Sequence, residues 1–344
     1  MAPRWDKDKG LKPTWVFCYN GQDGTTMSKR ISLKQFGRQR ESGLTLIVLL
    51  MAAVLAIVAD GFLTTDNIFN VLKQTTLVMI VAIGQTYVIT SGGIDLSVGQ
   101  TMTLSSMVLS YLLSFNFGLP WAILAGVLAS VLVGVLNGVM VTGLNIPPFI
   151  ITLGMSNIVR GIILVMSKGY IVSLDNPFIA ELGQGSVGPV PIMVLFMPVA
   201  VIIMAFTLNK TVFGNKVKAV GGNETAATLS GIKVKRTRIL VYTISGLLCG
   251  IAGIIVTGRL NGGNPNAAGT YDMDSIAAVV VGGTSFSGGS GTVVGTMLGA
   301  LLMILIRNGL VLLQVNMYWQ TVAIGCVIIM VCALDGYTQK NKGR

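Results

Sequence analysis

Long runs without a charged residue alternate with short polar segments along most of the chain. The longest run, residues 96–159, holds 64 residues and no charge, which is room for about three membrane helices of roughly 20 residues each. Runs of this length predict helices that cross a membrane, because a transmembrane barrel would show short alternating segments. Further charge-free runs cover residues 42–59, 74–94, 182–209, 239–258, 275–306 and 308–334.

The pattern predicts an all-α fold, a polytopic membrane helix bundle with about ten transmembrane helices. The span at 275–287 is short and rich in glycine, so it also fits a re-entrant segment, and a count of eight stays open. Prolines in Gly118-Leu119-Pro120 and Pro147-Pro148 suit the first turn of a helix. The expected spans lie near residues 44–62, 71–90, 96–115, 119–143, 148–166, 190–209, 239–258, 275–287, 292–313 and 318–334.

Small residues and a polar break add two expectations. Gly126, Gly134, Gly138 and Gly143 fall within one span, and glycines let membrane helices approach closely. Residues 166–190 carry charges, a proline and glycines, which predicts an external loop where a soluble partner could dock.

Basic residues flank the apolar runs, and they give the chain a formal net charge of +11. The loop at 210–238 holds seven Lys or Arg against one Glu. We expect the protein to lie in the inner (plasma) membrane of a bacterium. Since basic loops stay in the cytoplasm, we place this loop and both termini on the cytoplasmic side. The retention of basic loops on the cytoplasmic side explains the net positive charge, so nucleic-acid binding is not needed to account for it. The other basic clusters are Lys29, Arg30, Lys34, Arg38 and Arg40 near the start and Lys340, Lys342 and Arg344 at the end.

The charge pattern divides the chain into three expected parts. These are a cytoplasmic N-terminal tail at 1–43, a transmembrane domain at 44–337 with its cytoplasmic loop at 210–238, and a C-terminal tail at 338–344. Residues 1–26 form a polar lead before Met27-Ser28-Lys29-Arg30, so we predict that translation starts at Met27. The first apolar run has no clear cleavage site and is predicted to be a retained helix.

Several kinds of chemistry lack their residues. The chain has no histidine, and its four cysteines form no CxxC pair, so we expect no catalytic, cofactor or metal site. The glycine-rich run at 282–291 lacks the Gly-Lys-Ser/Thr ending of a phosphate-binding loop. The chain is therefore not expected to use ATP without a partner.

Two glycine-interrupted segments resemble each other. Residues 88–99 and 281–291 each break an apolar run. The first segment ends in Val-Gly and is followed by Thr-Met, and the second is followed by both pairs. Such interruptions in both halves of a chain can mark a solute path. An internal repeat and a chance likeness both stay open. The candidates for the path or its gate are Asp95, Ser97, Gly282, Gly283, Thr284 and Ser285.

Three charged residues next to apolar runs have two interpretations each. Asp95 could be a helix N-cap, with Gly93 ending the previous helix, or it could line the path. Arg160 and Arg307 could reach a membrane interface or pair inside the bundle.

The basic loop contains a short capped helix. Asn223 is a good N-cap, Glu224 suits the positive helix end, and Gly231 suits the residue after the helix. A helix of about two turns does not persist without support in water, so it is either a surface helix or one that docks on a partner. Ala226 and Ala227 are small enough to lie close to such a partner.

This loop closely resembles the coupling segment of ribose-type sugar ABC transporter permeases. The resemblance rests on Asn223-Glu224, Ala226-Ala227, Leu229-Ser230-Gly231-Ile232 and Val234. Three further stretches are similar to that family, residues 91–99, 274–285 and 307–310, and the likeness spans about residues 62 to 337.

The resemblance implies a type II ABC importer-like architecture. A homodimer or heterodimer of permease subunits would form the pathway. An ABC ATPase subunit would bind ATP and Mg. The residues that would contact this ATPase are Asn223, Glu224, Ala226, Ala227, Leu229, Ser230 and Gly231. A periplasmic or lipid-anchored binding protein would deliver the sugar. A ribose-like pentose is the first expectation, and a hexose, autoinducer-2 or a nucleoside is the alternative. A secondary transporter lacks acids and histidines for ion coupling, and a membrane enzyme lacks a catalytic constellation.

Overall fold

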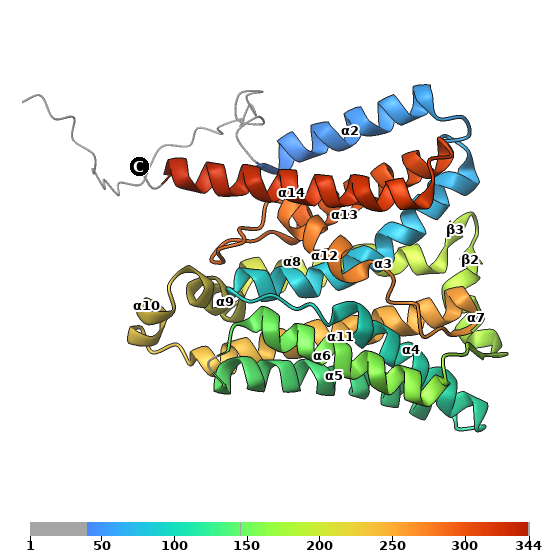
Figure 1. Cartoon of the computed structure of the whole chain (residues 1–344), viewed down its shortest axis with the longest axis horizontal. Coiled ribbons are helices and arrows are strands. Elements are labelled where there is room, and N and C mark those ends of the chain that lie inside the picture. Colours follow the sequence, from blue (N-terminus) through green and yellow to red (C-terminus); the bar gives the residue numbers. More distant parts are fainter. Residues whose placement is uncertain (1–39, 145, 343–344) are drawn as a thin grey trace, which may run out of the picture.

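The chain folds into a bundle of long helices with two short strand pairs (Figure 1). The computed structural model describes residues 40–144 and 146–342. The predicted start at Met27 lies outside these residues. The elements are α2 (Arg40–Val58), α3 (Thr65–Thr90), α4 (Val98–Ser114), α5 (Leu119–Gly143), α6 (Pro148–Ser167), β1 (Val172–Ser173), α7 (Pro177–Gln184), β2 (Ser186–Val187), β3 (Val190–Pro191), α8 (Ile192–Lys210), α9 (Val212–Gly222), α10 (Glu224–Leu229), α11 (Val234–Leu260), β4 (Gly262–Gly263), α12 (Tyr271–Val281), α13 (Val293–Leu312) and α14 (Met317–Lys342).

The predicted helical membrane bundle is confirmed, and each expected span coincides with a helix. Within the described residues, seven helices are long and apolar enough to cross a bilayer. The predicted spans outside that set are α4, α12 and α14. α12 has only 11 residues, and it therefore rises about 16 Å, half of the roughly 30 Å hydrocarbon core. α12 is therefore too short to cross the bilayer, as the alternative of a re-entrant segment at 275–287 allowed.

α3, α11 and α13 form the inside of the bundle. Each is buried over more than half of its most apolar stretch, whereas α2 and α8 expose most of theirs. On α3 every residue from Thr75 to Thr90 is buried. These inner helices carry polar side chains at depth, so they are the place to look for a function beyond packing.

Glycines on α5 allow α11 to approach closely. A Cβ added to Gly134 would lie 2.4 Å from the carbonyl oxygen of Tyr242, and one on Gly138 would lie 2.7 Å from Cα of Ile239. Gly126 packs in the same way on α4. The packing prediction is confirmed for these three and wrong for Gly143, which ends α5 and has no neighbour within 4 Å of an added Cβ.

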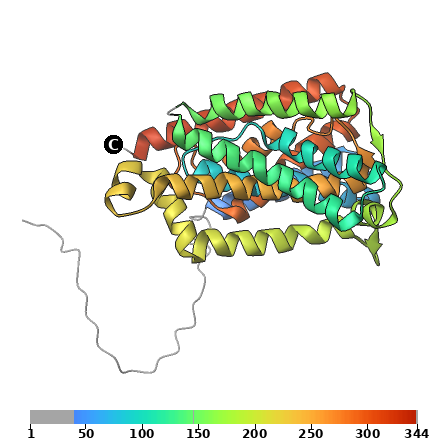
Figure 2. The same cartoon turned by 90° about the horizontal axis from the view of Figure 1, so that it is seen from below.

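The bundle has two distinct ends. α9 and α10 project beyond the long helices at one end, which we call the α10 end, and α7 with β2 and β3 lies at the other, the α7 end (Figures 1 and 2). The beginning of α2 and the end of α14 lie toward the α10 end (Figure 1). The predicted loop at 166–190 is thus partly ordered, with α7 capped by Asn176, whose Oδ1 accepts from the Ile179 amide at 3.2 Å.

Side-chain bonds align α3 and α13 antiparallel. At the α7 end the amides of Asn67 and Asn308 donate to each other, at 3.1 and 2.7 Å. About five turns farther along α3 and about three turns back along α13, toward the α10 end, the hydroxyls of Thr86 and Thr296 lie 2.7 Å apart. The two helices therefore link the two ends of the molecule directly.

Candidate functional site

The basic loop folds into two short helices with the predicted caps. Thr211 caps α9 by accepting from the Gly214 amide at 3.2 Å, and Asn223 caps α10 by accepting from the Ala226 amide at 2.9 Å. Gly231 follows α10 with a φ of +79°, a conformation that suits glycine. The local prediction of a capped helix between Asn223 and Gly231 is confirmed.

α10 is held against the start of α11. Glu224 and Arg238 form an ion pair at 2.8 Å, and Ala227 is buried against Val220 and Val234. A helix this short needs such contacts, because it is too short to persist without them. The loop therefore presents α10 as a supported element of defined orientation.

The face that α10 offers to a partner differs from the expected one. The expectation that both alanines lie against a partner surface is wrong for Ala227, whose side chain points into the loop and is only 3% exposed. Ala226 and Ser230 are exposed, and Leu229 is 84% exposed. The exposed face of α10 therefore carries Ala226, Leu229 and Ser230, and Leu229 is its large apolar side chain.

Immediately before α10, three distant glycine segments meet. The amide of Gly289 donates to the carbonyl oxygen of Thr90 at 2.9 Å. A Cβ on Gly221 would lie 1.9 Å from that carbonyl oxygen and 2.7 Å from the Gly289 nitrogen. We call Gly92, Gly221, Gly222, Gly288 and Gly289 the glycine junction, because a Cβ built on any of them lies within 4 Å of another member's backbone or of Thr90.

The junction unites the two look-alike segments of the sequence. One segment ends α3 and leads into α4, and the other ends α12 and leads into α13. Gly282 packs against the backbone of Gly295, and Thr284 lies beside Gly291. The candidates Gly282, Thr284 and Asp95 thus belong to segments that touch at the base of the coupling loop.

Two buried hydroxyls beside the junction lack a hydrogen-bond partner. These are Thr90 Oγ1 and Thr284 Oγ1, for which the described part of the chain supplies none. A Cβ on Gly291 would lie 2.1 Å from the first and 3.3 Å from the second. A buried hydroxyl without a hydrogen-bond partner is costly. An arrangement of the junction that let water or a solute reach these two hydroxyls would remove that cost.

Asp95 holds the chain between α3 and α4 to its neighbours. Its Oδ1 accepts from the amide and the hydroxyl of Ser97 at 2.9 and 2.6 Å, and its Oδ2 lies 3.5 Å from the Ser245 hydroxyl on α11. Asn137 on α5 donates to Ser97 at 2.8 Å. The candidates Asp95 and Ser97 are therefore fully engaged in a buried network.

Asp95 contributes to the capping of α4, because its carboxylate accepts from the Ser97 amide just before the first helical residue. A second carboxylate reaches the first turn from Asp272, whose Oδ1 accepts from the Gly99 amide at 2.5 Å. Sequence reasoning missed Asp272, because a capping residue 173 positions away leaves no local signal.

The two arginines have different surroundings. Arg307 on α13 pairs with Asp274 at the start of α12 at 3.0 Å and donates to Thr270 at 2.9 Å, so it pairs inside the bundle. Arg160 lies exposed on α6, and neither ion pair within the described residues includes it.

Removing the Asp95 carboxylate should destabilise the protein. Asp95→Ala leaves the Ser97 amide and hydroxyl without an acceptor in a buried site, which costs roughly 1–3 kcal/mol for each unsatisfied group. We expect a lower midpoint of thermal unfolding in detergent, and a smaller drop for Asp95→Asn. The control is Asp66→Ala, an exposed acid on α3. Equal midpoints for Asp95→Ala and the unaltered protein would contradict this role.

Residues 67–332 match the family described as branched-chain amino acid transport system / permease component. The chain belongs to this permease family. The match includes every predicted site residue. No solved structure matches the permease significantly.

Curated relatives cover the permease almost from end to end. It is 44% identical over 304 residues to the probable ABC transporter permease protein YphD of Escherichia coli (strain K12), spanning 88% of this chain and 92% of that protein. It is 40% identical over 312 residues to the ribose import permease protein RbsC of Bacillus subtilis (strain 168), spanning 90% and 96%. It is 36% identical over 302 residues to the D-allose transport system permease protein AlsC of Escherichia coli (strain K12), spanning 86% and 91%.

These relatives are transport proteins, and the predicted family resemblance is confirmed. The chain is a permease of the ABC importer class and not an enzyme, with the ATPase on a separate subunit. With its apolar helices it is a multi-pass protein of a bacterial inner membrane.

Proposed function

We propose that the permease forms the pathway by which an ABC importer takes up a monosaccharide, with a ribose-like pentose first and a hexose second. The support is that relatives of similar length are named for ribose and D-allose transport, although the family description names amino acids. A periplasmic or lipid-anchored binding protein would deliver the sugar. ATP and Mg would bind the partner ATPase.

The observation that carries the coupling proposal is the glycine junction at the base of α10. Gly221 and Gly222 end α9, and Asn223 starts α10. A displacement of α10 would therefore act on the end of α3 and on the segment between α12 and α13, because Thr90 and Gly289 lie against Gly221. We propose that the ATPase moves α10 and that the junction passes this movement to the segments around Asp95 and at 282–291, which act as the gate.

A basic groove beside α10 supports docking on an acidic surface of the ATPase. The groove has a volume of about 490 Å³, and its charged lining residues, Lys216, Lys233 and Arg236, are all basic. Opposite charges across an interface steer and orient the partners. Arg238, a further basic residue at the start of α11, is paired with Glu224.

The same arrangement supports a cytoplasmic α10 end. The start of α2 and the end of α14 lie at that end with the basic loop (Figure 1), so both termini would be cytoplasmic by the positive-inside rule. The α7 end would then face the binding protein.

Arg160 supports a pathway shared with a second permease subunit. It lies near the middle of the apolar helix α6, on an exposed face with Asn157 and two glycines, Gly154 and Gly161, that have open space around them. A charge in the membrane is costly unless it faces protein or water. We infer that this face of α6 meets the second subunit or the water-filled path.

The function is tested in proteoliposomes that hold the permease, its cognate ATPase and ATP, with the cognate binding protein outside. We expect ATP-dependent accumulation of labelled ribose, competed by unlabelled pentoses more strongly than by D-allose and not by leucine. Competition by leucine alone would overturn the sugar proposal. Uptake that needs an ion gradient and no ATP would identify a secondary transporter.

A further inference from the structure

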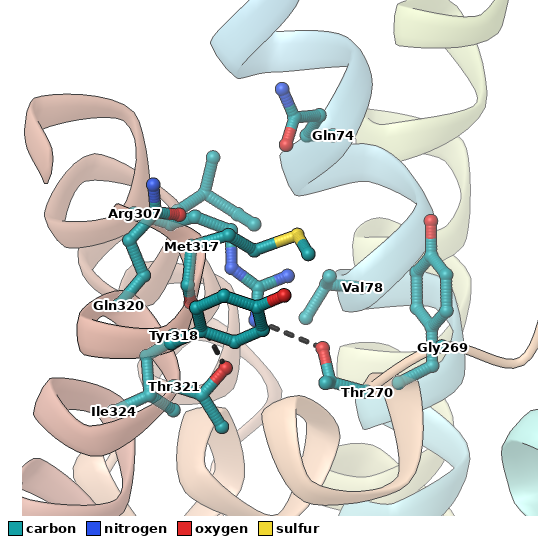
Figure 3. A pocket seen from close by; sticks show the side chains of 12 residues that line it. Gln74, Val78, Gly269, Thr270, Arg307, Met317, Tyr318, Gln320, Thr321 and Ile324 are labelled. Atoms are coloured by element: carbon teal, nitrogen blue, oxygen red, sulfur yellow. Dashed lines mark hydrogen bonds between the residues drawn. The ribbon is translucent and has the colours of Figure 1, made fainter. Parts of the chain in front are cut away.

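A pocket with both polar and apolar lining residues lies between four helices (Figure 3). Gln74 comes from α3, Arg307 from α13, and Tyr318 from α14, while Thr270 precedes α12. Its volume of about 350 Å³ lies at the small end of ligand pockets, roughly 300–1,000 Å³, which suits one small solute. The lining residues are Gln74, Val78, Gly269, Thr270, Tyr271, Ile304, Arg307, Met317, Tyr318, Gln320, Thr321 and Ile324.

The charge in this pocket is balanced by the protein itself. Arg307 is the charged lining residue, and its guanidinium is 3.0 Å from Asp274 and 2.9 Å from the Thr270 hydroxyl. Thr270 in turn donates to the second oxygen of Asp274 at 2.7 Å. An anion would have to compete with a buried carboxylate for Arg307, and a cation would meet no free acid. The pocket therefore favours an uncharged ligand.

Its remaining polar groups suit a ligand with many hydroxyls. Gln74, Gln320 and Thr321 offer amides and a hydroxyl, which both donate and accept. Gln320 and Thr321 lie near the ring of Tyr318, and Gln74 lies farther off on α3 (Figure 3). Val78, Ile304 and Ile324 supply apolar wall. Mixed donors and acceptors beside an aromatic ring match the two kinds of surface on a sugar ring.

The pocket is connected to the glycine junction through two helices. On the pocket side, Arg307 is followed on α13 by Asn308, which forms a hydrogen bond with Asn67 of α3. At their opposite ends, α3 reaches the junction through Thr90, and α13 reaches it through the preceding segment at 282–291. Two of the four family-like stretches, 274–285 and 307–310, meet here in the Asp274–Arg307 pair. The coupling segment does not account for either of them.

We propose that this pocket is a contact site for the neutral polyhydroxylated solute on its way into the permease. Gln74, Thr270, Gln320 and Thr321 make its hydrogen bonds, Tyr318 covers a face of its ring, and the Asp274–Arg307 pair excludes charged solutes. The inference rests on the proposed function and adds the residues that the solute touches.

The first test fills the pocket. Thr321→Trp should lower ATP-dependent ribose uptake at least tenfold in proteoliposomes, while the binding protein still stimulates ATP hydrolysis. The matched control is Val322→Trp, which adds the same bulk at the next, exposed position of α14 outside the pocket, and it should keep uptake within about twofold. Normal uptake by Thr321→Trp would overturn the pocket.

The second test adds no bulk and applies even if Thr321→Trp does not insert. Gln74→Leu and Thr321→Val each remove polar groups and should lower ribose uptake roughly three- to tenfold, as expected for lost hydrogen bonds. Unchanged uptake in both would refute the site. The unaltered permease is assayed in parallel. If it transports no monosaccharide, the proposed function is wrong. If it transports ribose and both variants do so equally well, the pocket is wrong.

Discussion

Replacing Gly221 with alanine is expected to reduce sugar uptake at least tenfold. The added Cβ would lie 1.9 Å from the Thr90 carbonyl oxygen and 2.7 Å from the Gly289 nitrogen. Both are backbone atoms, so the clash cannot be relieved by rotating a side chain. Overpacking of this kind typically costs about 1–3 kcal/mol or more, and here it would force apart the three segments that meet before α10.

The measurement is ribose uptake in proteoliposomes, together with binding-protein-stimulated ATP hydrolysis and insertion. Gly143→Ala is the control, because a Cβ at the end of α5 has no neighbour within 4 Å. We expect Gly221→Ala to insert, with a lowered thermal midpoint, and to lose uptake. Full uptake by this variant would show that the junction separates without consequence and would refute its role in coupling.

Leu229→Asp is expected to abolish binding-protein-stimulated ATP hydrolysis. Leu229 is 84% exposed at the end of α10, so the change adds a charge without disturbing a core. If Leu229 is a hot spot of the interface, its loss costs about 2 kcal/mol or more, which corresponds to roughly a 30-fold loss of affinity for the ATPase subunit. A new carboxylate would also repel an acidic docking surface.

The affinity is measured by titrating the purified ATPase onto the detergent-solubilised permease. Leu144→Asp serves as the control, since this exposed leucine follows α5 at the α10 end but outside the loop. A cysteine at Ala226 should crosslink to the ATPase more readily than one at the buried Ala227. Unaltered affinity of Leu229→Asp would place the coupling contact on another surface.

Local features of the fold could be predicted well. The long helices follow from runs of apolar residues, seven of them long and apolar enough for a bilayer within the described residues, and the starts of α5 and α6 follow from Pro120 and Pro148. The caps of α10 follow from Asn223 and Gly231, because capping depends on residues within one turn. The family resemblance could be recognised as well, since the residues that carry it, such as those at 223–234, are contiguous.

Contacts between distant segments could not be predicted in this way. Asp272 reaches the first turn of α4 across 173 positions, and Arg307 pairs with Asp274 across 33. The apolar pattern shows that these charges need partners but does not identify them. The orientation of Ala227 depended on Val220 and Val234, which pack on it from neighbouring helices.

The sequence by itself determined the membrane setting, most of the long helices and the position of the short capped helix α10, because hydropathy, charge and capping act over a few residues. The tertiary structure decided that the glycine segments near Thr90, Gly221 and Gly289 form one junction and that residues of four helices line one pocket beside Arg307. These arrangements depend on how α3, α12 and α13 pack. That packing is selected by the shape and pairing of residues far apart in the chain, which no local pattern records.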